Sequence, residues 1–385
     1  MMRVVIVGGG LAGARSCETL RARGFEGEIV LLAAEKHLPY DRPPLTKAAL
    51  KGELNTQLRT DYDALSIDVR TATAATGLDT SARKVHTAGG PVEYDALIIA
   101  TGAAPIRLPG TDRQLAVRTV DDSYALREKL VPGTKVVLVG ASWIGAEVAT
   151  AALAAGAEVT CIEFGPAPLG NALGEEVGKR FVDWWSEVDL RLGVGVREVT
   201  DTGVSLTTGE EIPADVVVAG VGVRPDVAWL EGSGLEIERG IVVDENLRTS
   251  DPHVFAVGDV AVRWSPRSSQ PLLVEHWDDA RTGPDSIAQT LTGGEPVAHD
   301  PVPYFWSDQF GHKLQYVGHH AATDTVVVRD GVDGKWAVAW IDEAGLLTAH
   351  LSIDTPKLMI GARAAIAACS RPDAAALRDI TQPLS

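Results

Sequence analysis

Cysteine is scarce in this sequence, and the spacing of the few that occur excludes several kinds of site. Only three are present in 385 residues, Cys17, Cys161 and Cys369, and no two of them form a C-x-x-C pair. Disulfide frameworks and zinc sites usually show more cysteines, often at short spacing. We therefore expect no structural disulfide, no metal site and no dithiol relay, and we expect a reducing cytoplasm as the location.

Basic runs and uncharged apolar runs are also missing. Lys and Arg number 35 against 52 Asp and Glu, a formal net charge of −17 that would repel a phosphate backbone. The most apolar long stretch, residues 143–162, contains Glu147 and Glu158 and makes a poor membrane-spanning helix. The first residues enter a buried-strand pattern at once, so we expect no export signal. We expect no nucleic-acid partner and no membrane partner.

A nucleotide-binding pattern is present, and it occurs twice. In the first copy an apolar strand at residues 4–7 is followed by G-G-G-L-A-G at 8–13, a helix to about residue 23, a strand at 28–32 and the acid Glu35. In such a unit the glycines allow a tight bend, close approach of a pyrophosphate and packing of the helix on the strand. The helix N-terminus offers free amides to the phosphates, and the acid binds ribose hydroxyls. This copy predicts a dinucleotide site.

The second copy begins with a strand at residues 135–139. The turn G-A-S-W-I-G at 140–145 follows, then a helix to about residue 155, a strand at 158–162 and the acid Glu163. Ser142 replaces the middle glycine, which strains the approach of a phosphate without preventing it. A carboxylate accepts hydrogen bonds from a ribose 2′-hydroxyl and repels a 2′-phosphate, and no Lys or Arg follows Glu163 until Lys179. NADH is therefore expected over NADPH, and two dinucleotide sites indicate a fixed flavin and a visiting nicotinamide.

Several further segments resemble a known family. A strand at residues 94–99 ends in A-T-G at 100–102, and an apolar segment at 254–257 ends in G-D at 258–259; with the first glycine turn, they resemble the FAD signatures of the two-dinucleotide-domain flavoprotein reductases. More specific is L-P-Y-D-R-P-P-L-T-K at residues 38–47. It resembles the P-Y-x-R-P-P-L-S-K segment of bacterial ferredoxin and rubredoxin reductases that serve oxygenases and cytochromes P450. Residues 117–119, 275–277 and 304–309 are similar too, so the resemblance spans nearly the whole chain.

The motifs and the resemblance together imply an α/β fold with two Rossmann-like dinucleotide-binding domains and an α+β C-terminal domain. The predicted boundaries are 1–114 and 238–303 for a discontinuous FAD-binding domain, 115–237 for an NADH-binding domain and 304–385 for the C-terminal domain. In the last, the residue pattern predicts strands at 315–317, 325–329 and 336–341 and a helix at 356–368.

The same sources give the candidate site residues. The FAD site is expected to include Gly8, Gly10, Ala12, Gly13, Glu35, Arg42, Lys47, Ala75, Thr101, Gly102, Arg118, Gly258, Asp259 and Trp277. The NADH site is expected to include Gly140, Ser142, Ile144, Gly145, Glu147, Glu163 and Gly222. Lys47 and Glu147 are the expected catalytic residues, because a cation near the flavin ring stabilises its reduced anion and the resemblance puts Glu147 near the nicotinamide. Trp306, in the aromatic segment that matches the family's flavin-adjacent stretch, is expected on the route of electron exit.

The function that the resemblance implies is transfer of a hydride from NADH to FAD, followed by single-electron transfer to a two-iron two-sulfur ferredoxin. Rubredoxin is the alternative carrier. An NADH oxidase or peroxidase, or a protein that acts chiefly through interactions, stays open at this point. Oxidases and disulfide reductases usually need a reactive cysteine, and the segment 39–47 has none.

Overall fold

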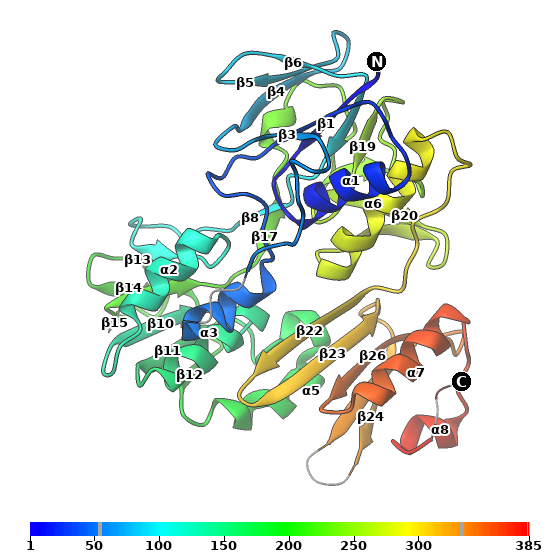
Figure 1. Ribbon diagram of the computed structural model, residues 1–385. Coiled ribbons are helices and arrows are strands. Elements are labelled where there is room, and N and C mark those ends of the chain that lie inside the picture. Colours follow the sequence, from blue (N-terminus) through cyan, green and yellow to red (C-terminus); the bar gives the residue numbers. More distant parts are fainter. Residues whose placement is uncertain (53–55, 332–334, 383, 385) are drawn as a thin grey trace. The chain divides into compact units, whose positions relative to one another are not determined.

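The computed structural model describes residues 1–52, 56–331, 335–382 and 384 (Figure 1). The chain divides into two compact units. Unit 1 comprises Met1–Asp41, Gln57–Ala104 and Val223–Pro303, and unit 2 comprises Arg42–Thr56, Pro105–Gly222 and Tyr304–Ser385. Most of the predicted NADH-binding segment thus shares a unit with the predicted C-terminal domain. The domain boundaries given above stay a prediction.

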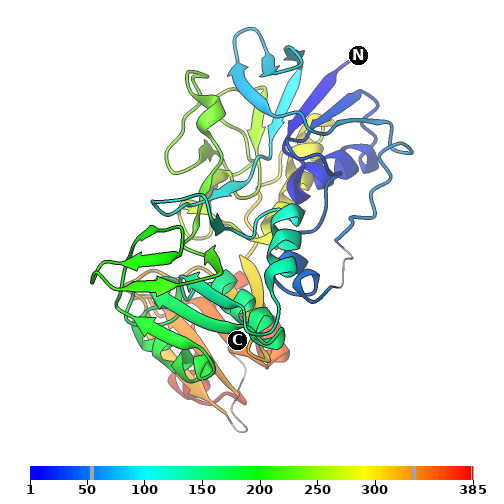
Figure 2. The same ribbon diagram turned by 90° about the vertical axis from the view of Figure 1, so that its left-hand side faces the viewer.

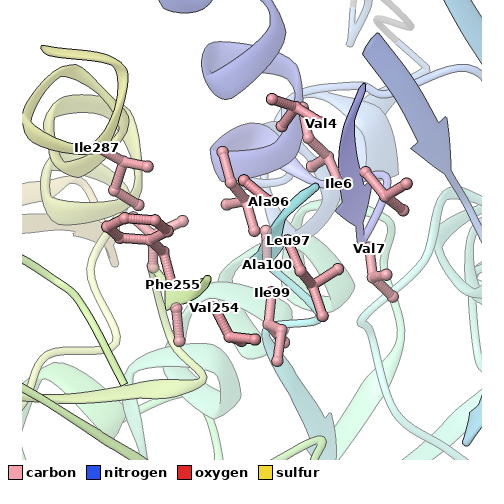
Figure 3. Packing of buried hydrophobic residues seen from close by; sticks show 14 of the residues in the cluster. Val4, Ile6, Val7, Ala96, Leu97, Ile99, Ala100, Val254, Phe255 and Ile287 are labelled. Carbon is pink, nitrogen blue, oxygen red and sulfur yellow. The ribbon is translucent and has the colours of Figure 1, made fainter. Parts of the chain in front are cut away.

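Unit 1 is built on a parallel sheet. Its order is β19 (Val254–Ala256), β7 (Ala96–Ile99), β1 (Arg3–Val7), β2 (Glu28–Leu32) and β3 (Ile67–Arg70). Strands β19, β7, β1 and β2 are mostly apolar because both faces of a parallel sheet are covered, whereas the edge strand β3 alternates apolar and charged residues. Helix α1 (Leu11–Ala22) packs against α6 (Trp277–Leu291). Figure 3 shows Ile287 of α6 packed beside Phe255 of β19 in the core that β1 and β7 share.

Smaller elements complete unit 1. An antiparallel sheet contains β4 (Ala75–Asp79), β5 (Lys84–Thr87) and β6 (Val92–Glu93). Another sheet contains β18 (Ile241–Val243), β20 (Ala261–Ser265) and β21 (Gln270–Leu273), and η4 spans Ala228–Leu230. The short strands β8 (Ala103–Pro105) and β17 (Val223–Pro225) pair where the chain passes between the units.

Unit 2 contains a second parallel sheet of the same kind. Its order is β12 (Asp189–Leu192), β11 (Glu158–Glu163), β10 (Lys135–Val139), β16 (Val216–Ala219) and β9 (Gln114–Leu115). The predicted strand, turn, helix and strand of both glycine units are confirmed, the second with α3 at Trp143–Ala154. The remaining elements here are η1 (Pro43–Thr46), η2 (Ala49–Lys51), α2 (Val120–Lys129), α4 (Gly170–Leu173), α5 (Glu175–Gly178), η3 (Lys179–Trp185), β13 (Val196–Val199), β14 (Gly203–Leu206) and β15 (Glu211–Pro213).

The C-terminal part of unit 2 is an antiparallel sheet. Its order is β22 (Tyr304–Gln309), β23 (His312–Gly318), β26 (Leu347–Ile353), β25 (Trp336–Ile341) and β24 (Thr325–Asp330), followed in the chain by α7 (Pro356–Ala367) and α8 (Ala374–Arg378). The three predicted strands and the helix are confirmed, whereas β22 and β26 were not predicted as strands. The residues of β26 alternate between apolar and polar, L-T-A-H-L-S-I, so the sequence contained a strand signal that the prediction missed. Strand β22 contacts α3. The orange antiparallel sheet lies beside the teal-to-green parallel sheet of unit 2 in both views (Figure 1 and Figure 2).

Among the described residues, no helix combines the length and the apolar character needed to cross a membrane.

Candidate functional site

The first glycine turn joins β1 to α1 and leaves backbone exposed at the helix start. Gly8 has φ +125°, and a Cβ added there would lie 2.1 Å from the carbonyl oxygen of Ala100. A Cβ on Gly13 would lie 2.0 Å from the carbonyl oxygen of Gly8. Gly10 is the N-cap of α1 without a side-chain hydrogen bond, and the first turn has no acid. These features fit a pyrophosphate, because the amides at the helix start stay available and no carboxylate opposes the anion.

Three predicted FAD motifs meet at one edge of the first sheet. Strand β1 lies between β2 and β7, where the strand order reverses, and ligands of such sheets bind beyond the carboxyl ends of the strands at this point. The A-T-G segment follows β7 and the G-D segment follows β19, the next strand in the sheet. A Cβ on Gly258 would lie 3.3 Å from Cβ of Ala12, so the G-D turn closes on the glycine turn. The chain therefore presents a backbone-lined cradle that fits a dinucleotide.

Glu35 lies two residues beyond the position that corresponds to Glu163. Gly8 N donates to the carbonyl of Leu32, as Gly140 N donates to the carbonyl of Ile162. Ala33 therefore takes the place of Glu163 in the first unit. The Glu35 carboxylate is half-buried and accepts a hydrogen bond from the Tyr40 hydroxyl at 2.5 Å. Its contact with the FAD ribose stays a prediction.

Trp277 is fixed at the start of α6 by polar contacts. Its Nε1 donates to Oδ1 of Asp41 at 2.6 Å, and the Arg281 guanidinium lies 5.5 Å from its ring centre. Burial raises the pKa of the Asp41 carboxyl, although the hydrogen bond from Trp277 opposes this shift. The orientation of the indole is thus set within unit 1. Ala75 begins β4 in the same unit, and the FAD contacts of both residues stay predictions.

The second glycine turn repeats the geometry of the first with one change. A Cβ on Gly145 would lie 2.1 Å from the carbonyl oxygen of Gly140, and a Cβ on Gly140 would lie 2.6 Å from that of Gly220. Gly222 follows with φ +105°. Ser142 is the N-cap of α3, and its Oγ accepts a hydrogen bond from Gly145 N at 3.2 Å. The serine therefore occupies one amide of the helix start, which leaves one donor fewer for a phosphate.

Glu163 ends β11 with both carboxylate oxygens already oriented. Oε2 accepts from Ala141 N at 2.8 Å, and Oε1 accepts from Gly165 N at 2.7 Å. Each oxygen keeps a further lone pair for a ribose hydroxyl. On the neighbouring strand, Arg191 is held by Asp189 and Glu210, and these hydrogen bonds raise the pKa of its guanidinium. Two carboxylates therefore engage the Arg191 guanidinium.

A buried carboxylate lies at the centre of a polar cluster in unit 2. Glu147 on α3 is 4% exposed. Its Oε2 accepts from Lys47 Nζ at 2.8 Å and from Thr46 Oγ1 at 2.5 Å, and its Oε1 accepts from Ser307 Oγ at 2.5 Å. Gln309 Nε2 donates in turn to Ser307 Oγ at 3.0 Å. The two predicted catalytic residues thus form an ion pair, whereas Ser307 and Gln309 were not among the predicted site residues.

Short local structure holds Lys47 in this place. Pro43 and Pro44 begin η1, and Lys47 N donates to the carbonyl of Pro44 at 3.0 Å. The buried Leu45 accepts a hydrogen bond from Ser123 Oγ at its carbonyl, which ties the segment to α2. Arg42 donates from its guanidinium to the carbonyl of Arg118 near the start of the same helix. The FAD contacts predicted for Arg42, Lys47 and Arg118 stay predictions.

Strand β22 presents its aromatic residues on both faces. Successive side chains of a strand point to opposite faces, so Trp306 faces away from the side where Ser307 meets Glu147. The Trp306 ring stacks near Tyr304, with ring centres 6.0 Å apart. On the other face Phe305 packs edge-on against Trp143 of α3 at 4.7 Å. Strand β22 therefore links the polar cluster to α3, and the electron-exit role of Trp306 stays a prediction.

The three cysteines are unpaired, and two of them are buried. Cys17 and Cys161 have no exposed surface, while Cys369 is exposed. Burial raises the pKa of the Cys17 thiol to about 12 and that of Cys161 above its usual range, which disfavours the reactive thiolate.

Replacing Cys17, Cys161 and Cys369 together by alanine should keep NADH-driven carrier reduction within about three-fold of wild type, because Cys17 and Cys161 are buried packing residues and Cys369 forms no disulfide. Steady-state turnover at matched FAD content measures this. Loss of carrier turnover with the flavin still bound and reducible would demonstrate a thiol relay.

Residues 2–283 match the sequence profile of the family described as Pyridine nucleotide-disulphide oxidoreductase, and residues 304–385 match the Reductase C-terminal domain. The chain belongs to the pyridine nucleotide-disulphide oxidoreductase family. Its membership confirms the fold class and the family resemblance drawn from the motifs. Within the family, this chain does not have a disulfide among its described residues, since all three cysteines are free.

Several family members are similar over nearly their whole length. The ferredoxin–NAD(+) reductase component of the anthranilate 1,2-dioxygenase system of Burkholderia cepacia is 35% identical, over 98% of this chain and 97% of that protein. Putidaredoxin reductase of Pseudomonas putida is 33% identical, over 85% of this chain and 82% of that protein. In the crystal structure of Fdr9, the chain has 62% sequence identity to this one, and the two structures superpose with a TM-score of 0.98. The match covers 100% of both chains. The covalent putidaredoxin reductase–putidaredoxin complex is 30% identical with a TM-score of 0.94, over 100% of this chain and 97% of that one.

Proposed function

We propose that this chain is an FAD-containing, NADH-dependent ferredoxin reductase. The observation that supports it most is the meeting of the glycine turn, the A-T-G segment and the G-D segment at the switch point of the unit 1 sheet. A second glycine turn with an oriented acid in unit 2 supports a separate nicotinamide site. Relatives of similar length are named as ferredoxin–NAD(+) reductases.

The residues of the chain divide the work. A bound flavin supplies the conversion of a two-electron hydride donor into a source of single electrons. The amides at the start of α1 hold its pyrophosphate, and Asp259, half-buried after β19, holds its ribitol. Glu147 keeps the Lys47 ammonium in one position by an ion pair, so that the cation is available to a developing negative charge.

The proposed partner is a two-iron two-sulfur ferredoxin, with rubredoxin as the second candidate. One solved relative is a complex with putidaredoxin, and other relatives serve dioxygenase systems by name. Steady-state oxidation of NADH with and without each carrier tests the proposal. Turnover that needs the carrier supports it, whereas full turnover with oxygen alone would favour an oxidase. A cytoplasmic location is part of the proposal, because unpaired cysteines suit a reducing compartment.

NADH should reduce the enzyme at least about 10-fold faster than NADPH at equal subsaturating concentration, because one charged hydrogen bond amounts to about 1.5–3 kcal/mol. The proposal is that the Glu163 carboxylate accepts a hydrogen bond from the 2′-hydroxyl, and it is supported by the two acids that hold Arg191. Glu163→Gln should narrow this preference, and Glu158→Gln on the exposed start of β11 is the control. Anaerobic stopped-flow absorbance gives the rates; equal rates for both nucleotides in wild type would refute the preference.

Replacing Trp306 by alanine should slow reduction of the ferredoxin more than reduction of the flavin by NADH, because the ring is proposed to lie between flavin and carrier. Trp264→Ala, on β20, is the matched control, since Trp264 is 43% exposed and belongs to unit 1. The two half-reactions are measured separately at equal FAD content. Unchanged ferredoxin turnover would remove Trp306 from the exit route.

A further inference from the structure

One large apolar side chain in unit 2 is exposed to an unusual extent beside the proposed NADH site. Phe164 directly follows Glu163 and is 81% exposed. Among the described residues, only Met1 at the start of the chain is a more exposed large apolar side chain. Because the ring is little buried by the fold, its face is open to stacking by a flat ligand.

The backbone on both sides of Phe164 is held in place. Gly193 N donates to the carbonyl of Gly165 at 3.0 Å, and Val194 N donates to the carbonyl of Glu163 at 3.1 Å. Gly165 N also donates to the Glu163 carboxylate. The loop after β12 is thus bonded to the loop after β11 before and after Phe164. The ring is therefore displayed from a fixed backbone.

Glycine residues near the Phe164 ring leave the neighbouring surface without side chains. A Cβ added at Gly195 would lie 3.4 Å from Cδ2 of Phe164 and 3.0 Å from Cγ2 of Thr207. The ring edge therefore lies against backbone, while most of the ring surface stays open. Gly165 and Gly193 add no side chains to this neighbourhood. A flat group can approach the ring without meeting a side chain of these three residues.

The covalent structure of NADH would bring its flat adenine base close to Phe164. Its pyrophosphate binds at the start of α3 and its adenosine ribose at Glu163, and the base is attached on the side of the ribose away from the phosphate. Beyond Glu163, away from the glycine turn, the next residue of the chain is Phe164. We propose that Phe164 stacks on the adenine of NADH and sets the affinity for the adenosine half of the nucleotide. This inference rests on the proposed NADH site in unit 2.

Binding of ADP-ribose to the oxidised holoenzyme tests the proposal by isothermal titration calorimetry. Stacking of a base on an aromatic side chain predicts that Phe164→Ala raises the dissociation constant about 5- to 150-fold, while Phe164→Trp keeps it near the wild-type value. Ile360→Ala, which removes a 64% exposed apolar side chain from α7, is the control and should leave it unchanged. A dissociation constant within two-fold of wild type for Phe164→Ala would overturn the proposal.

Reduced nicotinamide mononucleotide, which has no adenine, separates stacking from damage to the domain. With this donor the flavin of the Phe164→Ala variant should be reduced at the wild-type rate. With NADH the KM of the variant should rise, while kcat at saturating NADH should stay within two-fold of wild type. Equal loss with both donors would overturn the proposal, as would a raised KM for ferredoxin with unchanged nucleotide binding. NADPH has the same base, so its KM should rise by the same factor as that for NADH. If the proposed preference for NADH is wrong, the wild-type enzyme will show equal rates of flavin reduction with NADH and NADPH. That result is separate from the effect of Phe164→Ala.

Discussion

Replacing Gly145 by alanine should leave a yellow protein that NADH reduces about 100-fold more slowly or worse, whereas replacing Gly13 by alanine should leave a protein without flavin. In both turns the new Cβ would meet a backbone carbonyl, at 2.1 Å from Gly140 and at 2.0 Å from Gly8. Neither carbonyl can move without shifting the start of the helix, and a shift of about 1 Å in a binding site costs about 100-fold in rate. The two substitutions are chemically identical and lie in different units.

The pair of variants tests which glycine turn serves which cofactor. FAD content comes from the ratio of flavin to protein absorbance, and nucleotide binding comes from anaerobic reduction. Gly361→Ala on α7 is the control, because a Cβ there meets nothing within 4 Å. The opposite result, with flavin lost from the Gly145 variant and kept by the Gly13 variant, would exchange the two assignments.

The two nucleotide units were predictable because each is written in consecutive residues. A buried parallel strand is apolar along its length, and the glycines at residues 8, 13, 140 and 145 fill places where a Cβ meets backbone. Glu163 could be found by its distance from the turn. Glu35 shows the limit of counting, since hydrogen-bond register places Ala33 at the equivalent point and directs Glu35 to Tyr40.

The rest of the candidate site depends on tertiary contacts. Ser307 is 160 residues from Glu147, and only the packing of β22 on α3 brings their side chains within 2.5 Å. Thr46 stands where the similar family segment has serine, and its hydroxyl donates to Glu147. Phe164 gave a sequence signal in hindsight, an aromatic residue directly after the acid, but its exposure required the structure.

The effects of replacing Lys47 and Glu147 should be non-additive, both in the free energy of unfolding and in the rate of flavin reduction. Lys47→Met leaves a buried carboxylate without its counter-ion, and Glu147→Leu leaves a partly buried ammonium, so each should lower the free energy of unfolding by about 3–5 kcal/mol. The double variant replaces both charges by apolar groups and should lose less than the sum of the two. Chemical denaturation of the holoenzyme at matched FAD content measures the three values.

The same two single variants and the double variant form a double-mutant cycle. Applied to the rate of flavin reduction by NADH, this cycle shows whether Lys47 and Glu147 share one role or have independent roles. If Glu147 acts by holding the Lys47 ammonium, removing either residue removes the same function, and the double variant should be no slower than the slower single variant. Ser307→Ala is the matched control, because it removes a neutral donor from the other oxygen of Glu147 and leaves the ion pair in place. Its effect on the rate should be smaller than that of Lys47→Met. Rate losses that multiply in the double variant would show that the two residues act independently, and the positioning role proposed for Glu147 would then be wrong.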